Sequence, residues 1–356
     1  MTTVQPGHTN PKPLHTLSLS ADPSSKRPPL DPPVFPPRAE IPQSGQIKTH
    51  PSAPFTERGT NGEADKAGKA RLVFVGTATC VLEWQGVRIM TDPNFLHAGD
   101  HVHLGPGVTG TRVTDPAFPI EGLPSVDVVV LSHFHADHFD QLVQEKLRKD
   151  LPIVTTRHAE KELMGLEGNG GAFTDVYGMD VWESTLLKIT DTPGKSNKKP
   201  VVRVVATPGK HIAGFIGAVN DAILHAIPPE GEEEVVEVGY RIYISGDTLM
   251  VDDLKEIPAR YPDVDLLLIH LGGTSIPGAK APLLMVTMDG KQGIQLVRLI
   301  SPKLTIPVHF DDYDVFASPR SDFEKEVESA GLGEKVLYLD RGDAFEFGVR
   351  GGSDGS

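Results

Sequence analysis

A short run of histidine and aspartate is the feature of this sequence best suited to chemistry. The segment Ser132–His138 reads Ser-His-Phe-His-Ala-Asp-His and places four potential metal ligands within six residues. A divalent cation requires neutral imidazoles and carboxylates on a rigid support. His133 and His135 point the same way on an extended chain, whereas Asp137 and His138 follow as the chain turns toward a helix. This spacing suits two adjacent metal ions; a chance cluster of surface histidines is the alternative.

The rigid support is the segment directly before this run. Val126–Leu131 is a continuous apolar run after Pro124, which predicts a strand buried on both faces. One loop cannot complete two coordination shells, so further ligands should follow other strands, where such folds place their chemistry. Three polar residues do so: His211 after Pro200–Thr207, Asp247 after Tyr240–Ser245, and His309 after Leu304–Val308. Each alone could be a structural histidine or a turn aspartate, but together they complete a site.

The remaining patterns predict sheets covered by helices in one α/β domain. An opening meander is expected, with a tight turn at Gln85-Gly86. Further strands are predicted at Arg71–Thr77, Thr79–Trp84, Val87–Thr91, Pro152–Thr155, Val264–Leu271 and Val336–Leu339, and helices at Phe139–Lys149, Val251–Ile257, Gly290–Ile300 and Pro319–Ala330.

The first 68 residues differ in composition from the rest. Of the 31 prolines, 13 lie in residues 1–60, and a run such as Asp31–Pro37 suits neither a helix nor a sheet interior. We expect residues 1–68 to be a mostly disordered proline-rich tail, acting as a spacer or as a docking site for a proline-reading domain. The folded domain would then span residues 69–350.

Composition narrows the classes of function. The 356 residues contain no apolar run of 18 or more, so no transmembrane segment is expected. Cys80 is the single cysteine, and no secretory signal is evident, which favours a reducing, cytoplasmic location. The net charge of −14 disfavours nucleic acid as a partner. A small-molecule substrate is expected, and the oligomeric state is left open, a homo-oligomer included.

The motifs resemble those of the metallo-β-lactamase superfamily over about residues 70–349. His133–His138 matches the HxHxDH signature, and Thr207–His211, Ser245–Thr248 and Pro307–His309 follow in the family's order. Asp92, in Thr91-Asp92-Pro93, matches the family's first motif. The chain is also similar to the branch of ascorbate-6-phosphate lactonase-like and N-acylphosphatidylethanolamine-hydrolysing phospholipase D-like enzymes, on Thr287–Asp289 and His309–Tyr313. Lys210, before His211, departs from the pattern of many members.

The resemblance implies an α+β fold, an αββα four-layer sandwich, with a dinuclear metal site. Zinc is the expected ion, two per chain, with manganese or iron as alternatives. Asp92 would accept a hydrogen bond from a ligand imidazole and fix its tautomer; the alternative is a turn residue that ends a strand. The implied ligands are His133, His135 and His211 for the first ion and Asp137, His138 and His309 for the second, with Asp247 bridging both.

The implied activity is hydrolysis by a metal-bridging hydroxide. It would cleave a lactone, an ester or a phosphodiester of a small substrate, with Asp137 also orienting the nucleophile. The alternatives are a phospholipase D-like phosphodiesterase and a non-catalytic metal-binding interaction protein. A diiron oxidoreductase is disfavoured, because oxygen-reducing members carry glutamate where this chain has His135.

Several segments are expected around the site. The Gly- and Pro-rich stretch 94–124, with His97, His101 and His103, is expected to form a lid. His270, Lys210 and Tyr313 are candidate substrate contacts; the alternatives are a structural or ligand-supporting histidine and two rim residues. Residues 222–239 are expected to form a solvated acidic loop.

Overall fold

The predicted meander forms the centre of the first of two sheets. The computed structural model describes residues 12–33, 40–53, 68–105, 108–168, 170–192, 200–211, 221–227, 238–276 and 284–350. Strands β3 (Lys69–Gly76), β4 (Thr79–Trp84) and β5 (Val87–Thr91) are antiparallel neighbours. Gln85 and Gly86 make the β4–β5 turn with φ values of 53° and 77°. The eight strands lie in the order β10-β9-β8-β5-β4-β3-β19-β2, with β10 (Val176–Met179), β9 (Ile153–Thr156), β8 (Val128–Val130), β19 (Ala344–Gly348) and β2 (Ile47–Lys48).

The second sheet has seven strands in the order β1-β11-β12-β13-β14-β15-β18. Their bounds are β1 (His15–Ser20), β11 (Ser184–Thr190), β12 (Val201–Thr207), β13 (Asp221–Ile227), β14 (Arg241–Ile244), β15 (Leu266–His270) and β18 (Leu304–Val308). Strands β14, β15 and β18 are parallel, and β12 runs the same way, because both β12 and β14 are antiparallel to β13. Their carboxyl ends therefore share one edge of the sheet.

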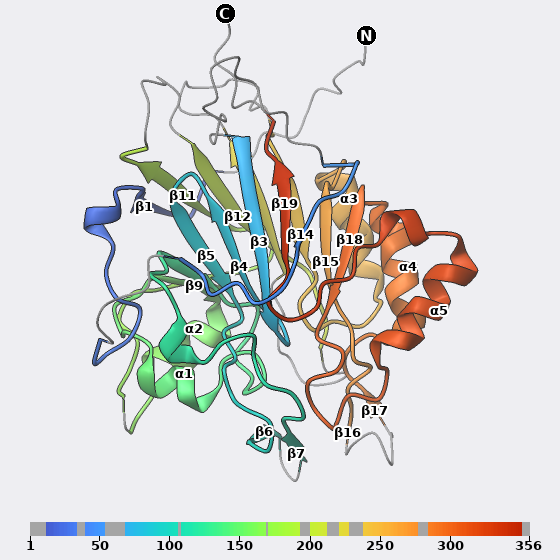
Figure 1. Ribbon diagram of the computed structural model, residues 1–356, viewed down its shortest axis with the longest axis horizontal. Helices are drawn as coiled ribbons and strands as arrows, with labels where there is room; N and C mark the ends of the chain where they lie inside the picture. Colours follow the sequence, from blue (N-terminus) through green and yellow to red (C-terminus); the bar gives the residue numbers. More distant parts are fainter. Residues whose placement is uncertain are drawn as a thin grey trace, which may run out of the picture.

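Helices cover the outer face of each sheet, as Figure 1 shows. Helices α1 (Gln141–Lys146) and α2 (Arg157–Met164) pack against the eight-stranded sheet. Helices α3 (Glu256–Arg260), α4 (Gly290–Ile300) and α5 (Arg320–Ala330) pack against the other. A third apolar core fills the space between the sheets. This arrangement confirms the predicted αββα sandwich. None of the helices in the described ranges has both the length and the apolar composition that a bilayer-spanning segment needs.

Apolar residues on both faces of the strands explain this layering. In β15, Leu266 and Leu268 pack between the sheets, while Leu267 and Ile269 face the helices. Each such side chain contributes about 1.5–3 kcal/mol when it leaves water. Because both faces are covered, these strands are continuous apolar runs in the sequence rather than alternating patterns.

The prediction of a disordered tail over residues 1–68 is wrong for residues 12–33 and 40–53. Strand β1 pairs in parallel with β11, burying Leu17 and Leu19, and β2 pairs with β19. The prolines flank these strands and do not interrupt them, so the edge hydrogen bonds can form. Residues 1–11, 34–39 and 54–67 lie outside the described residues.

Two local predictions also need correction. Val336–Leu339 forms no strand, because only Val336 makes a bridge to Thr305, while Leu339 turns into the core between the sheets. Residues 222–227, expected in an acidic loop, belong to the interior strand β13, which pairs on both sides. The loop residues 228–237 lie outside the described residues.

Short hairpins complete the fold. Strand β6 (His101–Gly105) pairs with β7 (Val108–Thr111), and β16 (Ser275–Ile276) pairs with β17 (Leu284–Met285). Both hairpins lie at the lower end of the molecule in Figure 1. The first belongs to the expected lid, so that segment is partly a regular hairpin.

Candidate metal centre

Three imidazoles meet beyond the ends of β8 and β12. His133 Nε2 lies 3.1 Å from His135 Nδ1, and His211 Nε2 lies 3.1 Å from the same atom. Two nitrogens that bind one zinc ion at about 2.0–2.1 Å lie about 3.3 Å apart in tetrahedral geometry. We call His133, His135 and His211 the three-histidine group. Its spacing fits a shared cation.

The other ring nitrogens of His211 and His133 contact neighbouring groups of the chain. His211 Nδ1 lies 2.9 Å from the carbonyl of Val286, to which its N–H donates, and His133 Nδ1 lies 3.0 Å from Ser132 Oγ. These contacts leave each Nε2 free to accept a cation. Burial, reinforced by neighbouring imidazoles, lowers the pKa of His133 well below its usual value and that of His135 to about 4. The group is therefore neutral at pH 7, the form that a metal binds.

A second group combines two carboxylates with two imidazoles. Asp137, His138, Asp247 and His309 are all buried, and one ligand atom of each lies within 4.8 Å of the others. His138 Nε2 lies 3.3 Å from Asp247 Oδ1, and His309 Nε2 lies 3.4 Å from Asp137 Oδ2. We call these four residues the mixed group.

The mixed group contains four buried atoms with no hydrogen-bond partner among the described residues: Asp137 Oδ1, His138 Nε2, Asp247 Oδ1 and His309 Nε2. A buried polar atom left unpaired costs about 1–3 kcal/mol, so four in one place require a common explanation. A cation among them would satisfy all four. The donor types and their burial therefore fit a second metal ion.

Opposite charges inside the mixed group shift its pKa values. Burial lowers the pKa of His138, but the carboxylates of Asp247 and Asp137 raise it well above its usual value. Burial raises the pKa of Asp247, but His309 and His138 lower it well below its usual range. The carboxylate of Asp247 is therefore ionised, as cation binding requires.

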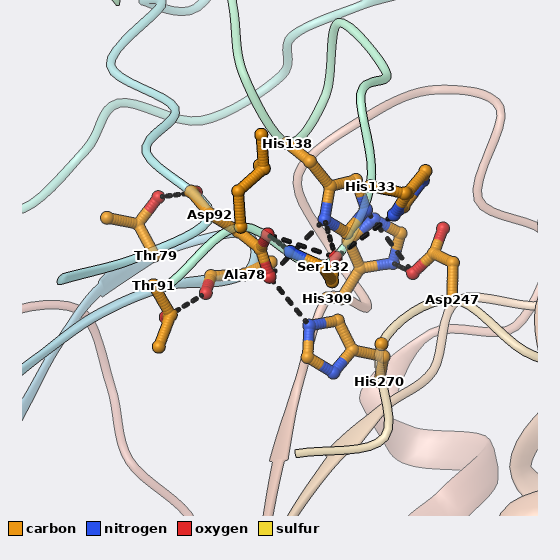
Figure 2. A network of polar contacts seen from close by, with 12 residues as sticks. Ala78, Thr79, Thr91, Asp92, Ser132, His133, His138, Asp247, His270 and His309 are labelled. Atoms are coloured by element: carbon orange, nitrogen blue, oxygen red, sulfur yellow. Dashed lines mark hydrogen bonds and ion pairs between the residues drawn. The ribbon is translucent and has the colours of Figure 1, made fainter. Parts of the chain in front are cut away.

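Supporting residues orient these ligands. Ser132 donates to Asp92 Oδ1 through its backbone N at 2.7 Å and its hydroxyl at 3.0 Å, and Asp92 Oδ2 lies 3.6 Å from His138 Nδ1 (Figure 2). Thr287 Oγ1 donates to Asp247 Oδ2 at 3.0 Å. Asp92 therefore lies within reach of a ligand imidazole, and its role as a support for that ligand stays a prediction. Ser132 and Thr287 had no such role in the sequence interpretation, although Ser132 directly precedes the histidine run.

The backbone is strained at three positions around the centre. Thr77, Asp92 and His309 have φ values of 51°, 36° and 61°, a region that residues other than glycine rarely occupy. The backbone N of His309 donates to the carbonyl of Thr77 at 2.8 Å, which joins two of these turns. Such strain persists where the surroundings impose it, commonly at functional sites.

A buried ion pair supports the turn that carries His309. Arg112 Nη2 lies 3.4 Å from Asp312 Oδ1, and Arg341 Nη2 lies 2.7 Å from the same oxygen. Asp312 Oδ2 accepts from the backbone N of Thr77 at 3.1 Å, next to the bond from His309. Sequence reasoning missed Arg112, because a lone arginine in a loop carries no signal of burial.

The structure brings the seven predicted ligands together but separates the other candidates. Asp247 lies in the mixed group. Its Oδ2 is 4.0 Å from Nδ1 of His211 in the three-histidine group, but that nitrogen faces the carbonyl of Val286 and is not the one available to a cation. The implied bridging role therefore stays a prediction. Lys210 is exposed next to His211, as a rim residue would be.

The two other candidate substrate contacts are buried. Tyr313 is 2% exposed, and its hydroxyl accepts from Asn94 Nδ2 at 2.8 Å, so it holds the loops together instead of lining the rim. His270 is 1% exposed, as buried as the ligands of the mixed group, and its role as a substrate contact stays a prediction.

The described part of the 94–124 stretch packs next to the ligand loop. Leu96 and Val102 form a small apolar cluster with Tyr313 and Val315, and Ala136, between ligands His135 and Asp137, packs against it. His97, His101 and His103 of the same stretch are exposed, away from both ligand groups. The role of this stretch as a lid stays a prediction.

Comparisons with known proteins agree with this geometry. A family model described as the Beta-lactamase superfamily domain matches residues 87–310. A UPF0173 metal-dependent hydrolase of Methanopyrus kandleri is 26% identical over 283 residues, covering 78% of this chain and 99% of the relative. Another, of Staphylococcus haemolyticus, is 24% identical over 277 residues, covering 78% and 100%.

Solved structures share the fold. An isothiocyanate hydrolase from Delia radicum gut bacteria superposes with a TM-score of 0.60 at 18% identity, covering 78% of this chain and 100% of that one. A possible metal-dependent hydrolase from Veillonella parvula gives 0.58 at 20% identity, covering 77% and 98%. The lactonase-like or phospholipase D-like branch stays a prediction. Since the family model spans more than half of the chain and includes all seven ligands of both groups, this protein belongs to the β-lactamase superfamily.

Proposed function

We propose that this protein is a metal-dependent hydrolase that acts on a small substrate. The observation that carries the proposal is the convergence of seven side chains, six of them buried and four of them with a ligand atom that has no hydrogen-bond partner among the described residues. The names of the curated relatives, which are metal-dependent hydrolases, support it. Zinc is the proposed ion at both groups, because the donors are rich in histidine and poor in aspartate.

Bound in such a centre, two divalent ions lower the pKa of a water molecule and polarise the bond to be cleaved. The three-histidine group would hold one ion and the mixed group the other. Asp137 Oδ1 is unpaired while Oδ2 lies 3.4 Å from His309, so this carboxylate has an oxygen available to orient the attacking water. Asp92 acts only through His138, which makes it a positioning residue.

Hydrolysis is favoured over redox chemistry by the donor set. Oxygen-activating iron sites combine histidine with carboxylate; the mixed group does so as well, but the three-histidine group contains no carboxylate. The net charge of −14 repels large polyanions, so a lactone or carboxylic ester is the preferred substrate class. A small phosphodiester is the second candidate, and phospholipase D-like cleavage is one form of it.

The test combines metal analysis with two kinds of substrate. The purified chain should contain close to two zinc ions and hydrolyse p-nitrophenyl esters or lactones faster than bis-p-nitrophenyl phosphate. The double variant Asp137→Ala/His138→Ala should lose this activity. The control His158→Ala, at an exposed position on α2, should retain it.

Three outcomes contradict parts of this proposal. Activity that survives the double variant would refute the catalytic assignment. Two bound ions without hydrolysis of any substrate class would favour a non-catalytic metal-binding protein. Iron-dependent colour in the pure protein would favour an oxidoreductase.

A further inference from the structure

His270 is a buried imidazole whose position the proposed chemistry leaves unexplained. It is the last residue of β15 and 1% exposed. Neither ring nitrogen has a hydrogen-bond partner within standard geometry among the described residues. His270 forms an ion-pair contact with Asp92, whose Oδ2 lies 3.7 Å from His270 Nε2. Burying an imidazole without hydrogen-bond partners costs free energy of folding, so we expect His270 to have a function.

The Asp92 carboxylate stands between two histidines. Its Oδ1 is held by both donors of Ser132, which limits rotation of the group. Its Oδ2 lies almost equally far from His138 Nδ1, at 3.6 Å, and from His270 Nε2, at 3.7 Å. Figure 2 shows both contacts reaching the same carboxylate. An ionised carboxylate accepts several hydrogen bonds, so both imidazoles can direct an N–H at it.

The position of His270 is itself fixed by the element that carries a ligand. Its backbone N donates to Ser245 Oγ at 2.9 Å, and Ser245 begins the turn that leads to Asp247. Its ring stacks with that of His138 at a centroid distance of 5.9 Å and an interplanar angle of 17°. His270 therefore connects the second sheet to Asp92, which lies at the end of β5 in the first.

We propose that His270 is a positioning residue that secures Asp92 and, through it, orients His138 toward the ion of the mixed group. This inference rests on the proposed metal centre. A carboxylate that holds the far nitrogen of a ligand imidazole is a general device of metal sites. Here a second histidine holds the carboxylate from the other side. His138 then keeps its proton on Nδ1 and presents Nε2, the atom found unpaired, to the ion.

The test titrates the chelator-stripped full chain with Co²⁺, whose visible absorption reports the geometry of its ligands. The wild type should bind two ions. His270→Leu should weaken the second ion by about 10-fold or more and change its spectrum, as loss of a supporting group does. The first ion, at the three-histidine group, should be unaffected. His270→Gln, which restores an N–H near Asp92, should recover part of the affinity.

A matched control separates positioning from simple destabilisation. Leu268→Ala removes a buried apolar side chain two residues before His270 in the same strand, which packs in the core between the sheets. It should lower the melting temperature without changing the affinity or spectrum of either ion. His138→Ala should remove the second ion altogether.

The outcomes distinguish this inference from the proposed function. A His270→Leu chain that binds both ions with wild-type affinity and spectrum would overturn the inference and leave the metal centre intact. Three ions in the wild type, with the third lost in His270→Leu, would show that His270 is itself a ligand and would also overturn it. A wild type that binds no Co²⁺ would overturn the metal centre, and the inference with it.

Discussion

Buried carboxylates lie near both ends of strand β15, but their charge is balanced in different ways. Asp265, just before the strand, is 2% exposed and accepts from Arg350 at 2.7 and 2.8 Å, from Lys303 at 2.7 Å and from the backbone N of Arg241 at 2.9 Å. The chain therefore supplies the full positive charge that this carboxylate needs. Burial raises the pKa of Asp265, but Arg350 and Lys303 lower it below its usual value.

At the other end the carboxylates have only histidines. The ion pairs that the described residues give Asp137 and Asp247 are with His138, His211 and His309. One oxygen of each carboxylate has no hydrogen-bond partner among the described residues. The comparison teaches that Asp265, a buried carboxylate of the scaffold, has its own lysine and arginine, whereas the ligand carboxylates leave room for a cation from outside.

Removal of metal should have the largest effect on stability, and it should act only through the ligand carboxylates Asp137 and Asp247. Ions at about 100 times their dissociation constants stabilise the fold by about 2.7 kcal/mol per site. We expect chelation to lower the melting temperature by roughly 5 °C or more in a domain of this size. Differential scanning calorimetry with and without zinc measures the shift. The Asp265→Asn variant should show the same fall in melting temperature on chelation. If chelation changes the melting temperature of neither protein, the ligand carboxylates do not depend on a bound cation, and the comparison fails.

Asp265→Ala, just before strand β15, should produce the next largest effect on stability. It leaves the cations of Arg350 and Lys303 without their carboxylate, although about half of each side chain is exposed to water. We expect a loss of about 2 kcal/mol in the free energy of unfolding, measured by urea denaturation. Metal stoichiometry should be unchanged. A loss of metal in this variant would show that the two ends are coupled.

Thr287→Val should produce a smaller effect, a lower affinity for the ion of the mixed group. It removes the hydrogen bond to Asp247 Oδ2 while it preserves the side-chain volume. The affinity for the second ion should fall by about 10-fold, as measured by titration with a chromogenic chelator. Thr287→Ser, which keeps the hydroxyl, is the control and should bind almost normally. Equal affinities in all three proteins would show that this hydrogen bond does not support Asp247.

The smallest expected effect is the change in the free energy of unfolding at acidic pH that Asp265 causes. Because the pKa of Asp265 is below its ordinary 3.8 in the folded protein, its stabilising contribution is complete above that value. It is lost as the pH falls through the lowered folded value. The stability gap between the wild type and Asp265→Asn should therefore narrow below about pH 4. A gap independent of pH, in urea unfolding of the chelated proteins, would contradict this assignment.

Much of the fold could be predicted from local patterns. The Gln85-Gly86 turn between β4 and β5 and the apolar periodicity of Gly290–Ile300 are features of neighbouring residues, and both were predicted within the observed bounds. Strand β1 was not predicted, because its stability depends on pairing with β11, some 170 residues away. Val336–Leu339 failed for the opposite reason: a strand-like composition cannot form a strand without a partner along its length.

The candidate site divides in the same way. The ligand types and their places after strands were determined by the sequence alone, because carboxyl ends of parallel strands must meet at one edge. Only the tertiary structure decided that His270 faces Asp92, that Tyr313 is buried against Asn94, and that Asp247 lies with the mixed group. These contacts join the ends of different strands in two sheets. Their distances depend on how the sheets pack, which no local pattern records.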